Sequence, residues 1–224
     1  MYEVIQVRGV EAFSRYGQPV LHDVSMTVRR GECMRVLGDK DSGKSTLARL
    51  IGGMERPAAG EVTVLGRRMS ALEEQTAAVF RNKYIGYVSA KPVLWDGFTV
   101  AENAAMPLAV QGASREYREV SAERMLEMAG LGYAAHVYPQ SLSPGEARIA
   151  ALARALVAQP EILILEDALE GLDENYARRF IETVELCREE ESLTLLSFTE
   201  TEDDGMESDR TVRLKRGRIQ GEKR

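Results

Sequence analysis

GDKDSGKS, residues 38–45, is the segment from which the architecture of this chain can be inferred. It matches the phosphate-loop pattern, in which four residues separate two glycines and a lysine and a serine follow. The apolar run Cys33–Leu37 precedes the segment, and a helical pattern, Thr46–Ile51, follows it. Backbone N–H groups of such a loop, together with the helix N-terminus, bind phosphate oxygens. The order of strand, loop and helix therefore predicts a nucleotide site.

Side-chain chemistry assigns roles within this loop. We expect Lys44 to reach the outer phosphates of the nucleotide and the Ser45 hydroxyl to be a ligand of Mg²⁺. Asp39 and Asp41 add two carboxylates to a loop that binds polyanions, and Lys40 offsets them in part. We therefore expect somewhat weakened nucleotide affinity. The predicted nucleotide-binding residues of this segment are Gly38, Asp39, Lys40, Asp41, Ser42, Gly43, Lys44, Ser45 and Thr46.

A second segment, ILILED at residues 162–167, predicts the other half of the same site. Four aliphatic residues indicate a buried strand that ends in two acids, Glu166 and Asp167. In phosphate-loop proteins a hydrophobic strand brings an acid to the Mg²⁺. The alternative is a core strand whose terminal acids are merely solvated.

Composition limits the classes of function. The 224-residue chain carries a net charge of -6, which does not favour nucleic acid or an anionic membrane as a partner. Two isolated cysteines, Cys33 and Cys187, indicate a reducing compartment rather than a metal site. The N-terminal residues lack the apolar core of a signal peptide, and no apolar run is long enough to span a bilayer. We expect a soluble, cytoplasmic protein whose membrane spans, if it needs any, belong to another chain.

Hydrophobic patterns along the chain favour an α/β fold. β-rich segments fill the first third, and strand patterns then alternate with helical ones, which is typical of a parallel, doubly wound sheet. A helical stretch runs from Lys91 to about Gln159 and would form an inserted subdomain. A helix near Glu174–Glu190 separates the last two parallel strand patterns.

Residues 142–156, LSPGEARIAALARAL, lie between the phosphate loop and the downstream segment ILILEDALEGLD. In this order the motifs resemble the ATP-binding subunit of ABC transporters over nearly the whole chain. LSPGE is similar to the family's signature motif, LSGGQ or LSGGE, and Leu172-Asp173 is similar to its D-loop. FRNKYIGYV, TVAENAAMPL and the C-terminal GRI look similar to the lipoprotein-release and macrolide-export subfamily.

The resemblance implies a P-loop NTPase fold with a RecA-like core sheet, an N-terminal antiparallel β subdomain and an inserted α-helical subdomain. One domain would span residues 1–224, with its core at 1–89 and 157–224 and its helical signature subdomain at 90–156. In the family two subunits dimerise head to tail, and the signature of one completes the site of the other. The residues that would act in trans are Ser143, Gly145, Glu146 and Asp173.

Two further positions carry over from the family. Tyr16 matches the aromatic residue that stacks on adenine, although it could simply flank a turn before Gly17. Ser143 is also a good N-cap for the helix that follows it. Pro144 removes a backbone N–H from the signature, so it could loosen phosphate contact.

The family's paired acids occur here in reverse order. Relatives read Asp-Glu, where Asp supports Mg²⁺ and Glu polarises the attacking water. Pro160 and Leu172-Asp173 set the register, so Glu166 takes the metal position and Asp167 the catalytic one. Glu166 still offers an oxygen ligand, but Asp167 is one methylene too short. A loss of about one ångström in reach can lower the rate ~10²-fold.

Two more hydrolytic positions differ from the family. Ala90 stands where relatives have a glutamine that contacts Mg²⁺ and water, and Thr199 stands where they have a histidine that contacts the terminal phosphate. Residues that bind nucleotide therefore persist, whereas those that hydrolyse it in the chain's own site are altered. This asymmetry favours a degenerate subunit of a heterodimeric transporter, with ATP and Mg²⁺ as ligands and weak or absent hydrolysis in its own site.

The resemblance also implies partners and a location. These are a second ATP-binding subunit, in a hetero- or homodimer, and integral membrane permease subunits at the inner face of the cell membrane. An ordinary homodimeric ATPase with slow turnover, or a nucleotide-gated regulator of a membrane protein, remain alternatives. A small-molecule kinase or GTPase would leave the signature and the D-loop unexplained.

Overall fold

The computed structural model describes residues 2–223, except for the side chains of Glu190 and Glu191. Within this range the chain forms two compact units. The first unit contains residues 2–81, 164–167 and 194–223, and the second contains residues 82–163 and 168–193. The division that we expect at residues 90 and 156 stays a prediction.

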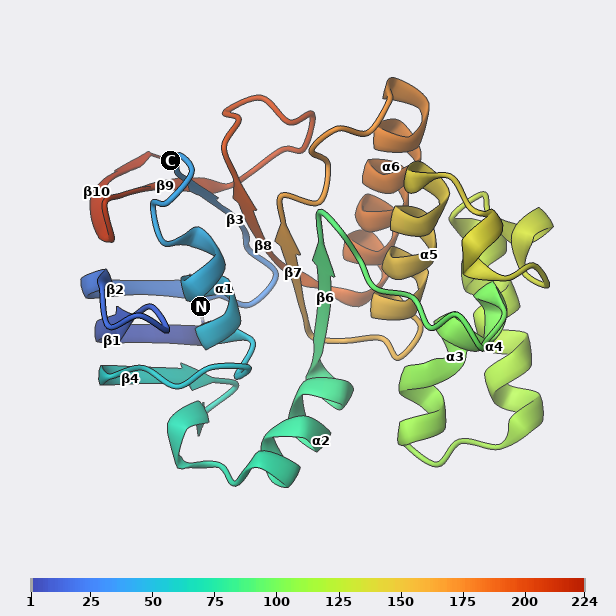
Figure 1. The fold of residues 1–224 in the computed structure, drawn as a ribbon, viewed down its shortest axis with the longest axis horizontal. Helices are drawn as coiled ribbons and strands as arrows, with labels where there is room; N and C mark the ends of the chain where they lie inside the picture. Colours follow the sequence, from blue (N-terminus) through green and yellow to red (C-terminus); the bar gives the residue numbers. More distant parts are fainter. Residues whose placement is uncertain (1, 224) are drawn as a thin grey trace. The chain divides into compact units, whose positions relative to one another are not determined.

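Most strands belong to the first unit and most helices to the second (Figure 1). The strands are β1 (Glu3–Phe13), β2 (Pro19–Arg29), β3 (Cys33–Leu37), β4 (Ala59–Val64), β5 (Arg67–Arg68), β6 (Ile85–Ser89), β7 (Ile162–Glu166), β8 (Thr194–Thr199), β9 (Arg210–Lys215) and β10 (Arg218–Lys223). The α-helices are α1 (Lys44–Ile51), α2 (Glu74–Tyr84), α3 (Val100–Val110), α4 (Arg115–Met128), α5 (Pro144–Leu156) and α6 (Glu174–Glu191).

The N-terminal sheet is antiparallel, with the strand order β2-β1-β4-β5. Ile5 of β1 lies opposite Val28 of β2 and Val64 of β4, and all three side chains are fully buried. Polar residues alternate with these apolar ones, as expected for a sheet with one covered face. The antiparallel β part that the resemblance implies is therefore confirmed.

The second sheet has the order β10-β9-β3-β8-β7-β6, and β3 pairs in parallel with both β8 and β9. All five residues of β3 are buried, because a parallel strand is covered on both faces. Helix α1 packs against strands of both sheets in the first unit. This arrangement directs the end of β3 into the phosphate loop and confirms the α/β fold with a parallel core sheet.

Helices α3, α4 and α5 pack against one another in the second unit, and α5 also packs on β6 and α6. Two of these helices begin with reciprocal capping boxes, Thr99 with Glu102 and Ser143 with Glu146. The expected helical insertion and the N-cap at Ser143 are thus confirmed. None of the helices within residues 2–223 has the length and apolar character that a membrane span requires.

Candidate nucleotide site

The phosphate loop has tightly packed surroundings at its first residue. A Cβ atom on Gly38 would lie 2.5 Å from Ser42 Oγ and 2.6 Å from the Leu214 carbonyl oxygen, so only glycine fits there. Ser42 N–H donates to the Asp39 carbonyl at 3.1 Å. The Ser42 hydroxyl is buried and has no hydrogen-bond partner among the described residues. Because such a group is costly to bury alone, a phosphate oxygen is a fitting partner for it.

Lys44 opens helix α1 and is only 4% exposed. Its ammonium donates to the carbonyl oxygens of Gly38 at 2.5 Å and Asp39 at 3.2 Å. Nζ also lies 3.5 Å from Glu200 Oε1. The buried charge is therefore held within the loop by carbonyl oxygens and faces one carboxylate, which suits a group that exchanges partners when a phosphate binds.

Magnesium would depend on the nucleotide for some of its ligands. Within residues 2–223 no cluster of three or more His, Cys, Asp or Glu side chains could hold a metal ion by itself. Mg²⁺ commonly binds through one or two protein oxygens together with substrate phosphates. Ser45, half-buried in the first turn of α1, and Glu166, half-buried at the end of β7, offer oxygens of the right type.

Asp167 and Thr199 lie at the ends of the neighbouring strands β7 and β8. Asp167 N–H donates to the Phe198 carbonyl at 2.8 Å, and its φ of 46° is left-handed. Aspartate tolerates this region better than most residues. Thr199 accepts the Gly38 N–H at its carbonyl, 3.0 Å away. The backbone thus joins the phosphate loop, β8 and the acidic end of β7 into one site.

Thr199 also uses its side chain locally. Its hydroxyl oxygen accepts the Thr201 N–H at 3.2 Å, which stabilises the turn that carries Glu200. The Thr199 hydroxyl therefore supports the backbone of the following loop.

A buried arginine holds that loop in place, a feature that the sequence patterns did not reveal. Arg35 lies in the middle of β3 and is 9% exposed. It donates to the Glu202 carbonyl at 2.7 Å, to Asp204 Oδ1 at 2.5 Å and to the Met206 carbonyl. A charged residue within an otherwise apolar strand was the available signal, because such residues are rarely buried without partners.

Tyr16 lies in the turn between β1 and β2 and is 76% exposed. The Arg15 guanidinium carbon lies 4.8 Å from the centroid of its ring. An exposed ring of this kind is available to a nucleobase, but the same placement fits a simple turn residue. Stacking on adenine stays a prediction.

The signature residues lie in the second unit, at the start of α5. Ser143 N–H donates to Glu146 Oε2 at 2.7 Å, and Glu146 N–H donates to Ser143 Oγ at 3.3 Å. Pro144 occupies N1, where a missing N–H is tolerated by the helix. The Ser143 hydroxyl therefore accepts the Glu146 N–H, and its side chain is also hydrogen-bonded to the Glu146 carboxylate.

Packing around the signature explains its glycine. A Cβ atom on Gly145 would lie 2.3 Å from the Tyr176 ring, so α5 and α6 can approach closely only with glycine here. Asp173 caps α6, because its Oδ1 accepts the N–H groups of Asn175 at 3.0 Å and Tyr176 at 3.1 Å. These two predicted trans residues thus have structural roles inside their own unit.

Tyr133 is a neighbour of the signature that the sequence analysis missed. Its hydroxyl donates to Glu146 Oε1 at 2.6 Å. This bond lowers the pKa of Glu146, with the Ser143 N–H contributing next, and it raises the pKa of Tyr133. Glu146 is therefore kept ionised as the acid of the capping box. A lone tyrosine in a short turn carries no sequence signal for such a contact.

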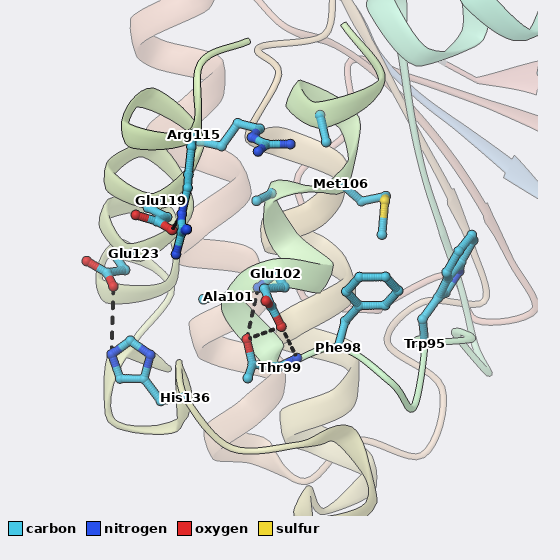
Figure 2. A pocket seen from close by; sticks show the side chains of 13 residues that line it. Trp95, Phe98, Thr99, Ala101, Glu102, Met106, Arg115, Glu119, Glu123 and His136 are labelled. Carbon is cyan, nitrogen blue, oxygen red and sulfur yellow. Dashed lines mark hydrogen bonds and ion pairs between the residues drawn. The ribbon is translucent and has the colours of Figure 1, made fainter. Parts of the chain in front are cut away.

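Ala90 follows β6 in the second unit and begins an irregular segment that leads to a groove of about 740 Å³. Figure 2 shows Trp95, Phe98 and Met106 along one part of this groove, and Arg115, Glu119, Glu123 and His136 along another. Trp95 is 54% exposed, and its ring centroid lies 5.9 Å from that of Phe98.

The backbone of the segment that carries these aromatic residues is held by side chains of α3 and α5. Buried Asn103 accepts the Trp95 N–H at 2.7 Å and donates to the carbonyls of Trp95 and Phe98, each at 3.1 Å. Arg154 donates to the Val93 carbonyl at 2.8 Å, and burial lowers the pKa of this guanidinium. The groove therefore presents exposed rings on an ordered backbone.

The first unit thus brings together the phosphate loop, Glu166, Asp167 and Thr199, with Tyr16 in a turn of the same unit. The second unit contains Ala90 and the predicted trans residues Ser143, Gly145, Glu146 and Asp173.

Comparison with known proteins agrees with these motifs. A family profile described as ABC transporter matches residues 21–170. The lipoprotein-releasing system ATP-binding protein LolD of Chromohalobacter salexigens is 32% identical over 200 residues, which are 89% of this chain and 84% of that protein. The methionine import ATP-binding protein MetN of Mesorhizobium japonicum is 35% identical over 215 residues. That match covers 95% of this chain and 59% of the relative's length.

A solved structure gives the same result for the fold. The dimeric post-hydrolysis structure of the ATP-binding cassette MJ0796, bound to ADP and Pi, has a TM-score of 0.92 and 26% identity. The match covers 98% of each chain. The cbiO1 protein of Clostridium perfringens, at 21% identity and a TM-score of 0.86, shares the fold.

Proposed function

The chain belongs to the ABC transporter family of ATP-binding proteins, and from this premise we propose that it is a degenerate ATP-binding subunit. It binds ATP with Mg²⁺ in its own site, hydrolyses that ATP very slowly and completes a competent site on a partner subunit. Relatives named for lipoprotein release favour an exporter-like transporter with membrane subunits.

The observation that carries the proposal is the contrast between the two halves of the nucleotide site. The phosphate loop keeps a buried Lys44 and a buried Ser42 hydroxyl that has no hydrogen-bond partner in the described part of the chain, which supports phosphate binding. The hydrolytic positions hold Ala90, Asp167 and Thr199. A methyl group offers no donor or acceptor, and the Thr199 hydroxyl oxygen is engaged by a backbone N–H. Binding without efficient hydrolysis follows from this set.

The trans role rests on the signature. Ser143 lies at the N-terminus of α5, where N–H groups and the helix dipole favour a phosphate, and its hydroxyl would turn from Glu146 to that phosphate. Glu146 and Tyr133 hold this end of the helix in place. The phosphate that binds here would belong to the ATP of the partner subunit. Asp173 would lie near the same interface, as the family pattern implies.

The permease would bind in the groove of Figure 2. Exposed rings on an ordered backbone lose little entropy on binding, and aromatic residues often anchor interfaces. Phe98 and Met106 are apolar, whereas Arg115 forms an ion pair with Glu119 and His136 lies 3.7 Å from a Glu123 oxygen. A short amphipathic cytoplasmic helix of the permease matches these two kinds of lining. The chain would then act peripherally at the inner face of the cell membrane.

Calorimetric titration with Mg-ATP tests the binding half of the proposal. Wild type should bind, and Lys44→Ala should lose measurable binding because it removes the phosphate-facing ammonium. Lys83→Ala is the matched control, since Lys83 is an exposed lysine of α2 that lies outside the phosphate loop. Absence of binding by the wild type, or equal binding by wild type and Lys44→Ala, would mean that the assignment is wrong.

A further inference from the structure

The ammonium of Lys44 faces a carboxylate that none of the site motifs includes. Glu200 Oε1 lies 3.5 Å from Lys44 Nζ, and the Glu200 side chain is 37% exposed. The other two contacts of Nζ are the carbonyls of Gly38 and Asp39, which belong to the loop itself. Among the described residues, Glu200 is therefore the ion-pair partner that Lys44 has outside the phosphate loop.

The position of Glu200 is set by the backbone on both sides. Thr199 before it accepts the Gly38 N–H at its carbonyl and the Thr201 N–H at its hydroxyl. The loop after it is held to β3 by the buried Arg35. Because β3 leads directly into the phosphate loop, Glu200 and Lys44 are connected through short, ordered segments of the first unit.

Neighbouring acids of the same loop have other partners. Glu202 pairs with Arg213, and Asp204 pairs with Arg35. The loop is strongly acidic, yet its carboxylates are not equivalent with respect to the phosphate loop. An experiment can therefore separate the effect of the loop's overall negative charge on nucleotide affinity from the effect of the direct Glu200–Lys44 contact.

A phosphate that binds Lys44 must compete with this carboxylate. Opposite charges at this separation attract, and the attraction is weakened by the partial exposure of Glu200. A phosphate group brought to the same ammonium also meets the like charge of Glu200. Both effects lower nucleotide affinity, the first by occupying Lys44 and the second by repulsion.

We propose that Glu200 is an internal competitor for Lys44 that weakens nucleotide binding and must move aside when phosphates enter the site. The proposal deepens the function proposed above and rests on it, because it concerns the same phosphate loop. Glu200 follows Thr199, which stands where the family has a histidine. The contact of Glu200 with Lys44 would therefore inhibit nucleotide binding and would not take part in catalysis.

Glu200→Gln tests the contact, since it removes the charge and keeps the shape. Titration with Mg-ADP and with a non-hydrolysable Mg-ATP analogue should show binding about three- to tenfold tighter than wild type. The matched control is Glu202→Gln, which removes one charge from the same loop but breaks a pair with Arg213. At about 0.15 M salt, long-range effects are largely screened, so this control should change affinity less than twofold.

Several results would overturn the inference. Equal tightening by both variants would point to bulk charge, and unchanged or weaker binding by Glu200→Gln would show that the carboxylate does not oppose phosphate. If wild type fails to bind, the proposed function fails. In that case a gain of binding in Glu200→Gln would still support the inference, and no binding in either protein would refute it. Thermal unfolding of each variant checks that the fold is intact.

Discussion

Thr199 illustrates how one side chain can change the chemistry of a site while preserving its backbone. Its hydroxyl oxygen supports the turn at Thr201, and its carbonyl accepts the Gly38 N–H. Asp167 behaves similarly, because its left-handed backbone suits aspartate and its N–H binds Phe198. The proposed function therefore predicts slow hydrolysis from the side chains at positions 90, 167 and 199, since the strands that precede them are formed.

Restoring those side chains should therefore restore turnover. We expect the purified wild type to hydrolyse ATP well below the ordinary enzyme range of ~1–10³ s⁻¹. The triple substitution Ala90→Gln, Asp167→Glu and Thr199→His should raise the rate by roughly 10²-fold or more. The glutamate restores the missing methylene, and the glutamine and histidine restore the polar groups that relatives have at these positions. Steady-state phosphate release measures both proteins.

The same triple variant carrying Lys44→Ala is the control, because it should abolish any restored activity. A wild-type rate already within the ordinary range would contradict slow own-site hydrolysis. A triple variant that binds ATP but gains no activity would mean that another feature of the site limits the reaction.

Single residues also show what the sequence could and could not predict. The positions of Lys44 at the start of α1 and of Ser143 as the N-cap of α5 could be predicted, because each follows from a local motif. The Lys44–Glu200 and Tyr133–Glu146 contacts were not, because each joins segments whose approach depends on the tertiary fold. Their residue types, acid and tyrosine, are common on any surface.

Helices and strands with strong local signals were predicted well. β3 and β7 are almost wholly apolar, and α5 has a capping box followed by buried aliphatic residues. Helix α2 was not predicted, because of its described residues only Ala77 is buried and the apolar period is weak. The irregular segment 91–99 lies in the stretch for which the sequence predicts helix, whereas buried Asn103 holds much of it as a turn.

The turn presents Trp95 at the groove, so binding of the permease at this groove can be tested by substitution. Trp95→Ala should weaken association with the native permease by at least tenfold, because an exposed ring on a fixed backbone has the properties of an interface anchor. Co-purification from membranes, followed by a binding titration in detergent, measures the effect.

Tyr117→Ala is the matched control for Trp95→Ala. Tyr117 is an aromatic residue of α4 with 57% exposure, and it lies outside the lining of the groove. Wild-type association of the Trp95 variant, with its fold intact, would place the permease elsewhere on the chain.

The whole molecule distributes its predicted roles between two units. The first contains the phosphate loop with Lys44, and the second contains the signature with Ser143. The family resemblance implies that these two surfaces serve different nucleotides in a dimer, and on that proposal one chain can lose hydrolysis in its own site and still support it in the partner's. The sequence predicts this asymmetry, because the binding and signature residues match the family and the hydrolytic ones differ from it; the asymmetry itself stays a prediction.

The assembled transporter therefore offers the decisive comparison between a degenerate and an ordinary subunit. Ser143→Ala should lower steady-state ATPase activity of the complex by about 10²–10³-fold, because it removes a donor to the partner's phosphate. Ser143 is also an N-cap, so its loss destabilises α5 by about 1 kcal/mol. Ser114→Ala removes the cap of α4 instead and controls for that effect.

Asp167→Asn tests the contribution of this chain's own nucleotide site to the ATPase activity of the same complex. The substitution removes the only charge at the catalytic position of this chain's own site and keeps its size. If that site contributes little turnover, activity of the complex should change less than twofold. An ordinary homodimer predicts the opposite, because both of its sites depend on Asp167 and a loss at least as large as that of Ser143→Ala should follow. A strong loss from Asp167→Asn beside a small one from Ser143→Ala would therefore exclude the heterodimer and leave the slow homodimeric ATPase.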